Sequence, residues 1–307
     1  MPKLSYAKVA LTLDQQVQQL QARGMVIADE PLAKHYLGFI NYYRLAAYWL
    51  PFESDHASHQ FHPGTTFEQV LDRYVFDREL RLLLIDAIER VEVAVRTQYA
   101  YQLGHTHGAH LLLNASLFQP KRGRWSYATN RQQLEQDVAR SKETFIQHLL
   151  AKYNEPLPPI WAAVEIMTLG QLSKWYANLK RRADRNRVAH AFDMDETNLV
   201  SFLHHLAIVR NLCAHHSRVW NRELAFTYKL PKHRPAAVLG SLNPASPKKL
   251  YNTLVILGNL LDRLSPGHHW KSRLQQLIQA HQIPAYEMGF PAHWQQQPFW
   301  QIRVESQ

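Results

Sequence analysis

The chain has 307 residues, 46% of them hydrophobic, with one cysteine and a formal net charge of +10 at pH 7. This composition suffices for a sizeable core, and the single cysteine excludes both an internal disulfide and a multi-cysteine zinc site. No stretch approaches the roughly 20 apolar residues of a membrane span, and the first residues lack the apolar core of a secretory signal, so we expect a cytoplasmic protein without membrane contact. The charge favours a polyanionic partner such as nucleic acid, although a basic surface can also serve solubility alone.

Apolar residues recur mostly at intervals of three and four, which predicts an all-α fold. Helices are expected over about 14–23 and from Asp29 onward, where the Asp29 carboxylate can cap exposed amides. An aromatic-rich segment follows at 39–52. Its rings are typical of a core, although they could also stack unpaired bases; they include Tyr42, Tyr43, Tyr48 and Trp49.

The clearest helix is expected from Thr66 to about Leu103. Thr66 followed by Gln69 forms a capping-box pattern, and apolar positions then give a nearly continuous stripe. Acidic and basic side chains four residues apart support the helix on its other face, namely Asp77 with Arg81, Asp86 with Arg90, and Glu92 with Arg96.

Helices and irregular connections alternate in the rest of the chain. We expect a connection at 104–127, a polar helix up to Tyr153, a helix containing Trp161 and Trp175, a helix beginning near Asp193 or Asp195, and further helices near 247–264 and 270–282. The tail after residue 290 is too aromatic to be flexible. No repeat divides the chain, so a single domain is expected, with N-terminal helices at about 1–60, a bundle at about 65–225, and C-terminal helices and tail at about 226–307.

The segment 210–216 carries the residue types of metal-independent RNA cleavage. Such a reaction must deprotonate the ribose 2′ hydroxyl, protonate the leaving 5′ oxygen and stabilise the charged phosphorane. Histidine and arginine suit these tasks, and an amide such as Asn211 can orient either group. The candidate catalytic residues are Arg210, Asn211, His215 and, as an alternative proton carrier, His216.

Helix geometry bears on how these residues could act. Arg210 and His215 differ by roughly 140° around a helix, so they cannot share one narrow face. Asn211 and His215 do share a face, which His204, Arg218 and Arg222 would extend at helical spacing. Two copies of this face meeting about a two-fold axis could complete one site, which predicts a homodimer. A hydrogen-bonded helix interface remains the structural alternative.

The spacing by itself is weak evidence. The 22 arginines and 18 histidines give about four pairs separated by four to six residues by chance; requiring Asn after Arg, and His five positions after Arg, lowers the expectation to about 0.05. Two segments satisfy this pattern, the second being Arg185 and Asn186 with His190. That second segment lies in a basic run with Arg181, Arg182 and Arg187, which is typical of a solvated face and also suits contacts with an RNA backbone.

Several segments in chain order resemble signatures of the Abi-like (abortive infection) family, which belongs to the HEPN superfamily of helical ribonucleases. They are 23–29, 41–45, 76–81, 87–92, 158–165 and 210–221. The last is the most specific, whereas the proline and tryptophan tail at 291–300 resembles the family only loosely.

The resemblance implies a HEPN-type helical bundle with additional N- and C-terminal helices. It further implies an endoribonuclease without cofactors that leaves 2′,3′ cyclic phosphate ends, acts in phage defence, and pairs one motif from each copy of a homodimer. Arg210, Asn211 and His215 match the family's functional motif by position. Family members resemble toxins restrained by an antitoxin, for some a small structured RNA, so RNA is the expected partner.

Other residues are expected to support the site or to bind RNA. Glu89, Arg90, Glu92 and Arg96 could line the site opposite the motif helix, or form structural ion pairs instead. RNA contacts are expected from Arg218, Arg222, Arg181, Arg182, Arg185, Arg187, Tyr43 and Arg44. His105, His107 and His110 have metal-like spacing but no acidic or cysteine neighbour in the sequence, so no metal site is expected. Two alternatives to the enzyme stay open, a noncatalytic RNA-binding or sensor module and a helical scaffold that binds no nucleic acid.

Overall fold

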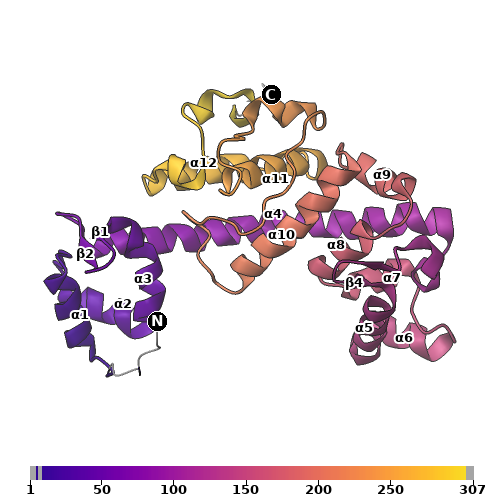
Figure 1. Cartoon of the computed structure of the whole chain (residues 1–307), viewed down its shortest axis with the longest axis horizontal. Helices are drawn as coiled ribbons and strands as arrows, with labels where there is room; N and C mark the ends of the chain where they lie inside the picture. Colours follow the sequence, from indigo (N-terminus) through magenta and orange to yellow (C-terminus); the bar gives the residue numbers. More distant parts are fainter. Residues whose placement is uncertain (1–4, 6–8, 302–307) are drawn as a thin grey trace. The chain divides into compact units, whose positions relative to one another are not determined.

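The computed structural model describes residue 5 and residues 9–301. Helices dominate it, which confirms the fold class predicted from the apolar spacing (Figure 1). The chain groups into two compact units, one formed by Met1–Leu80 with Leu277–Gln282, the other by Arg81–Gln276 with Ile283–Gln307. The longest helix, α4 (Phe67–His107), contributes residues to both units. Behaviour of the chain as a single domain stays a prediction.

The first unit begins with three short helices, α1 (Leu13–Ala22), α2 (Glu30–Phe39) and α3 (Tyr42–Trp49). Asp29 caps α2 as predicted, since its carboxylate accepts the backbone N–H of Leu32 at 2.8 Å. Tyr48 and Trp49 are buried, which confirms the core interpretation for these two rings, whereas Tyr43 is 71% exposed. Thr66 and Gln69 form the predicted capping box at the start of α4.

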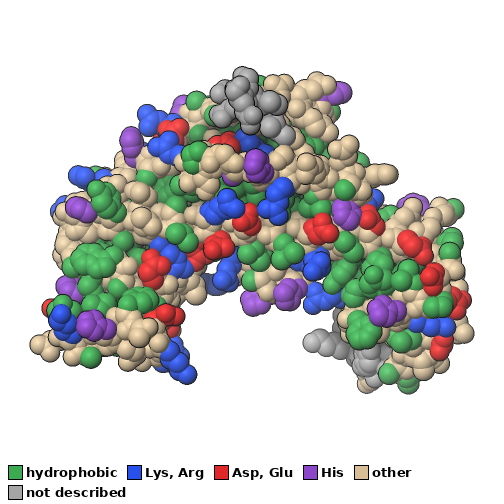
Figure 2. Space-filling view, turned by 180° about the vertical axis from the view of Figure 1, so that it is seen from behind, with side chains coloured by type: hydrophobic (Ala, Val, Ile, Leu, Met, Phe, Trp, Pro, Cys, Tyr) green, Lys and Arg blue, Asp and Glu red, His purple; other side chains and the backbone are tan. Residues whose placement is uncertain are grey.

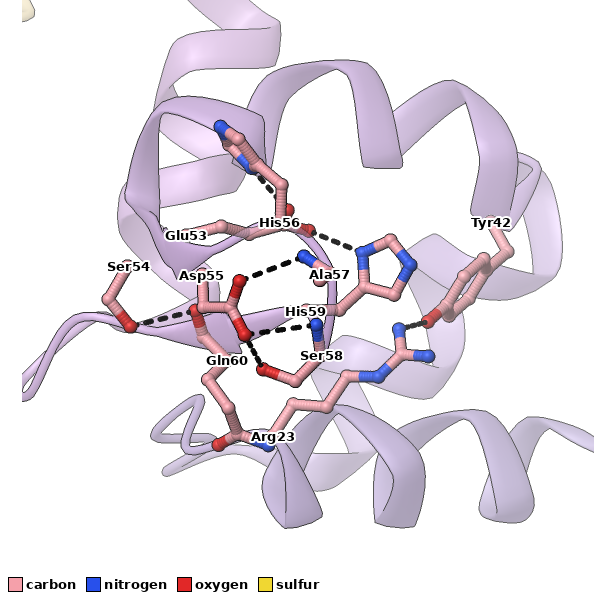
Figure 3. Close-up of polar contacts among 10 residues, drawn as sticks. All are labelled: Arg23, Tyr42, Glu53, Ser54, Asp55, His56, Ala57, Ser58, His59 and Gln60. Atoms are coloured by element: carbon pink, nitrogen blue, oxygen red, sulfur yellow. Dashed lines mark hydrogen bonds and ion pairs between the residues drawn. The ribbon is translucent and has the colours of Figure 1, made fainter.

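A small antiparallel hairpin, β1 (Glu53–Asp55) with β2 (Gln60–Phe61), follows α3 and surrounds a buried carboxylate. The two oxygens of Glu53 bond to Nδ1 of His56 at 2.8 Å and to Nδ1 of His59 at 3.3 Å (Figure 3). Asp55 closes the turn by accepting two backbone N–H groups. Strands this short give no detectable alternation of polar and apolar residues, which is why the sequence did not predict them.

The second unit holds the remaining helices. They are α5 (Tyr127–Arg140), α6 (Thr144–Lys152), α7 (Ile160–Ala163), α8 (Leu169–Ala177), α9 (Arg182–His190), α10 (Glu196–Ala214), α11 (Tyr251–Leu264) and α12 (Trp270–Ala280), with a hairpin of β3 (Lys121–Arg122) and β4 (Trp125–Ser126). The polar helix predicted up to Tyr153 is two helices, because residues 141–143 leave the helical conformation. Helix α4 also continues past the predicted end at Leu103.

Helix α10 packs against α8 and α9 with the apolar face that the sequence predicts. The buried side chains on this face are Leu199, Leu203, Leu206, Val209 and Cys213. The aromatic tail is also part of the core of this unit, since Trp294 and Trp300 are buried and Trp300 Nε1 donates to the hydroxyl of Tyr251 at 3.2 Å. Among the helices that the structure describes, none combines the length and the apolar character needed to cross a membrane.

Candidate active site

The motif histidines lie where helix α10 ends. The helix stops at Ala214, and His215 is its C-cap. Two backbone bonds of a Schellman motif close this end, from Ser217 N–H to Leu212 O at 2.8 Å and from His216 N–H to Cys213 O at 3.1 Å. His216 occupies the left-handed position of the motif with a φ of 57°, where glycine is the usual residue. Both histidine side chains are exposed.

This helix end corrects one expectation. Arg218 and Arg222 were predicted to extend the polar face at helical spacing, but they lie beyond the Schellman turn, outside the helix. The Arg218 guanidinium lies 6.0 Å from the ring of Trp220, and Arg222 Nη1 donates to the carbonyl of Arg218 at 3.2 Å. His204 is exposed on the helix and packs edge-on against the ring of Phe226. The polar face therefore ends at His215.

Buried contacts fix the chain on both sides of the motif. After it, Trp220 is fully buried and donates from Nε1 to Glu287 at 2.9 Å. Before it, His205 is 2% exposed. Its Nδ1 donates to the carbonyl of Phe226 at 2.9 Å, which leaves Nε2 to accept from the hydroxyl of Thr253 at 2.8 Å. The turn that carries His215 and His216 therefore lies between two segments that buried contacts hold in place.

Burial lowers the pKa of His205 to about 4, although the bond to the Phe226 carbonyl opposes this shift. His205 is therefore a neutral core histidine at pH 7 and takes no part in exposed chemistry. The polar face predicted from the sequence contained His204 and not His205. Helical spacing could have identified His205 as a core residue, because it falls on the same face as Phe202 and Val209, both of which are buried.

Arg210 is exposed and lines a cavity between α10 and α4. The cavity has a volume of about 360 Å³, and its polar lining residues are Glu89, Glu92, Arg96, Glu165 and Arg210. Three of the four α4 residues expected to support the site therefore lie beside Arg210. The fourth, Arg90, is not part of the lining and instead pairs with Asp86 at 2.9 Å. Neither His215 nor His216 is among the lining residues.

Arg96 shapes this cavity through its own bonds. It is paired with the carboxylate of Glu92 and donates to the backbone carbonyls of Val164 and Glu165, the latter at 2.9 Å. These bonds tie α4 to the short 3-10 helix η4 (Val164–Ile166) and fix the position of Glu165. Arg96 therefore links α4 to η4 and also lines the cavity. Glu165 was noted in the sequence only as part of a family segment and was not expected to line the site.

The basic run before α10 divides into structural and exposed residues. Glu196 is 4% exposed, and its carboxylate pairs with Arg185 Nε at 2.8 Å and with Arg182 Nε at 3.2 Å. The side chain of Arg185 is itself mostly buried by this contact, whereas Arg181 and Arg187 are exposed. Arg185 therefore serves an ion pair between α9 and α10 rather than a free basic surface.

Two residues expected to contact RNA lie in the first unit. They are Tyr43 and Arg44 on α3, and both are exposed. His107 Nε2 lies 3.0 Å from a carboxylate oxygen of Asp184, and no group of three or more potential metal ligands lies together among the described residues.

On the face drawn in Figure 2, basic side chains are interspersed with acidic and hydrophobic ones. The positive net charge is therefore not gathered into one continuous basic area on that face.

Comparison with known proteins gives one positive finding. The family model described as Abi-like protein matches residues 35–221, which is more than half of the chain. The matched range ends at Asn221, so it contains the motif, the Schellman turn and every residue that lines the Arg210 cavity. The search of curated proteins and the search of solved structures found no match. On the strength of the family match, this chain belongs to the Abi-like protein family.

Proposed function

We propose that this protein is a metal-independent endoribonuclease whose catalytic groups are Arg210, Asn211 and His215. Membership of the Abi-like family suggests a role in abortive infection, a defence against phage. The observation that carries the proposal is the exposed Arg210-Asn211 pair followed by His215 at the end of one rigid helix, inside the matched range. RNA cleavage would supply the defence by damaging the transcripts on which phage growth depends.

Each group has a role that its chemistry allows. The exposed imidazole of His215 can take the proton from the ribose 2′ hydroxyl, and an imidazolium can return one to the leaving 5′ oxygen. Arg210 can hold the phosphorane oxygens with its planar guanidinium. Asn211 accepts a long bond of 3.5 Å from Arg210 Nη1, so it is near enough to orient the guanidinium. Attack by the 2′ oxygen leaves a 2′,3′ cyclic phosphate and a 5′ hydroxyl.

One chain presents these groups in different directions. His215 follows Arg210 by five positions, which corresponds to roughly 140° of rotation and about 7.5 Å of rise along a helix. Three carboxylates, those of Glu89, Glu92 and Glu165, also line the cavity beside Arg210 and would repel a phosphate there. The scissile phosphate is therefore expected on the solvent side of Arg210, where a second copy of α10 in a homodimer supplies the complementary Arg210 and His215.

The test is cleavage of end-labelled RNA by purified protein in the presence of EDTA. We expect wild-type protein to cut with EDTA present. His215→Ala should lose at least about 100-fold in rate, the usual effect of removing a general acid or base, and Arg210→Ala should lose about as much because it removes the charge that stabilises the phosphorane. Arg263→Ala and His233→Ala are matched controls, because both side chains are exposed and lie outside the motif.

Two outcomes would contradict the proposal. Full activity in both motif variants would show that these residues do not carry the reaction. Tight binding of a structured RNA, with every RNA left uncut by the wild-type protein, would instead assign the chain to a noncatalytic RNA-binding module.

A further inference from the structure

A second cavity adjoins the one that Arg210 lines. It has a volume of about 400 Å³ and shares two lining residues, Arg96 and Glu165, with the Arg210 cavity. Its other lining residues are Thr97, Ala100, Tyr101, Gly104, His105 and Trp161. Every residue of both cavities lies in the second unit and inside the range of the family match. The two cavities therefore adjoin along α4, and together they form a recess of the second unit.

One face of α4 forms the floor of this recess. The α4 residues that line the two cavities recur at intervals of three and four, from Ile85 to His105. Over these 21 positions the helix rises about 30 Å. The second cavity exists because its central floor positions, Thr97, Ala100 and Gly104, are small. A Cβ at Gly104 would be in ordinary van der Waals contact with the indole ring of Trp161, at 3.9 Å, so Trp161 lies directly over this position of the helix.

Two large aromatic rings border the second cavity and remain open to solvent. Tyr101 is 57% exposed and Trp161 is 56% exposed, although both belong to residue types that usually bury their rings. The imidazole of His105 lies against the Tyr101 ring at 4.4 Å between centroids and is fixed by its Nδ1 donating to the Tyr101 carbonyl at 2.7 Å. About half of the surface of Tyr101 and of Trp161 is therefore available to a ligand.

The polar groups of the cavity suit a neutral, flat ligand. Arg96 is already bonded to Glu92 and to two carbonyls, so its charge is largely satisfied. The carboxylate of Glu165 is exposed, and no described side chain pairs with it. A carboxylate can only accept hydrogen bonds, and it would repel a phosphate. An unpaired nucleobase meets these conditions, because its faces stack on aromatic rings and its amino or imino N–H groups can donate to Glu165.

We propose that the second cavity is a subsite for one unpaired nucleobase of the bound RNA. Tyr101 and Trp161 stack the base, and Glu165 accepts from its Watson–Crick edge. This inference rests on the proposed ribonuclease function for the identity of the ligand. It adds that the enzyme cuts single-stranded or looped RNA, and that the Glu165 carboxylate favours a base with a donor on that edge.

Binding, rather than cleavage, tests the subsite. The probe is a fluorescein-labelled, single-stranded 12-nucleotide RNA of mixed sequence, compared with a set in which each nucleotide in turn is replaced by an abasic ribose. The protein carries His215→Ala, so that the RNA stays intact during fluorescence anisotropy measurements. We expect one abasic position to weaken binding by about 5- to 100-fold, the effect of losing one base stacked on aromatic side chains.

The variants identify where that base binds. In Trp161→Ala and in Tyr101→Ala, the loss of RNA affinity caused by the sensitive abasic position should shrink to less than about 2-fold. The matched control is Tyr286→Ala, which removes an exposed tyrosine of the same unit and should leave that loss of affinity unchanged. Circular dichroism of each variant confirms that it is folded, and Glu165→Gln gives a second measurement that leaves the rings in place and should change which base is preferred at that position.

The subsite would be overturned if no abasic position weakened binding more than the others (a flat scan). It would also be overturned if the same position weakened binding equally in the His215→Ala protein and in both ring variants. Neither result depends on cleavage. A wild-type protein that cuts RNA but shows a flat scan would retain the proposed function without the subsite, whereas a position-specific effect in a protein that never cuts RNA would keep the subsite and refute the ribonuclease.

Discussion

Acid should destabilise this protein through His205, and the size of the effect follows from its surroundings. The folded chain holds the pKa of His205 at about 4, because the imidazole is buried between Phe226 and Thr253. In the unfolded chain the pKa returns to about 6.5. The unfolded state therefore binds a proton in this range that the folded state does not, so stability is complete above pH 6.5 and falls as the pH drops towards 4.

Linkage between these two pKa values gives a loss of about 2 kcal/mol in the free energy of unfolding between pH 7.5 and pH 5.0. Urea unfolding followed by circular dichroism at the two pH values measures this difference. The comparison is His205→Gln, which cannot titrate, with His233→Gln as a matched control in an exposed loop. We expect His205→Gln to lower stability at pH 7.5 but to lose about 2 kcal/mol less than wild type on acidification. The same pH dependence in wild type and in His205→Gln would refute the reasoning.

Three further substitutions have definite expected outcomes. His216→Gly should change the free energy of unfolding by less than about 1 kcal/mol, because glycine suits the left-handed position, and RNA cleavage should continue; loss of cleavage would make His216 the proton carrier. Arg185→Ala should destabilise the fold by about 2 to 3 kcal/mol in urea unfolding, because Glu196 keeps only one of its two cationic partners, whereas the exposed Arg187→Ala should have no effect on stability. Arg96→Ala should cost about 2 kcal/mol in the same assay, and an unchanged stability would contradict its role as a link between α4 and η4.

Local signals account for the parts of the fold that the sequence predicted. The capping box at Thr66 and the apolar stripe behind it define the start and course of α4, and the Asp29 cap defines the start of α2. The break at 141–143 and the helix α9 were missed. In α9 charge conceals the periodicity, because only Asp184, Val188 and Ala189 of this helix are buried.

The candidate site could also be predicted only in part. The Arg210 block is recognisable from its residues and from the family resemblance, but the end of its helix is not. Glycine normally marks the left-handed position of a Schellman motif, and His216 occupies that position instead, so no glycine marks the end of this helix. The cavities could not be predicted from the sequence either, because they combine side chains at positions 85–105, 161–165 and 210 that only tertiary packing brings together.

The central claim is that Arg210 and His215 make this Abi-like protein an RNA-cleaving enzyme. The most direct measurement is sequencing of RNA 3′ ends that carry 2′,3′ cyclic phosphate, after induction of the wild-type protein in cells and of His215→Ala in parallel. We expect new cyclic phosphate ends at defined unpaired positions with the wild-type protein and their absence with His215→Ala. Growth inhibition by the wild-type protein without any new cyclic phosphate ends, or identical ends with His215→Ala, would contradict it.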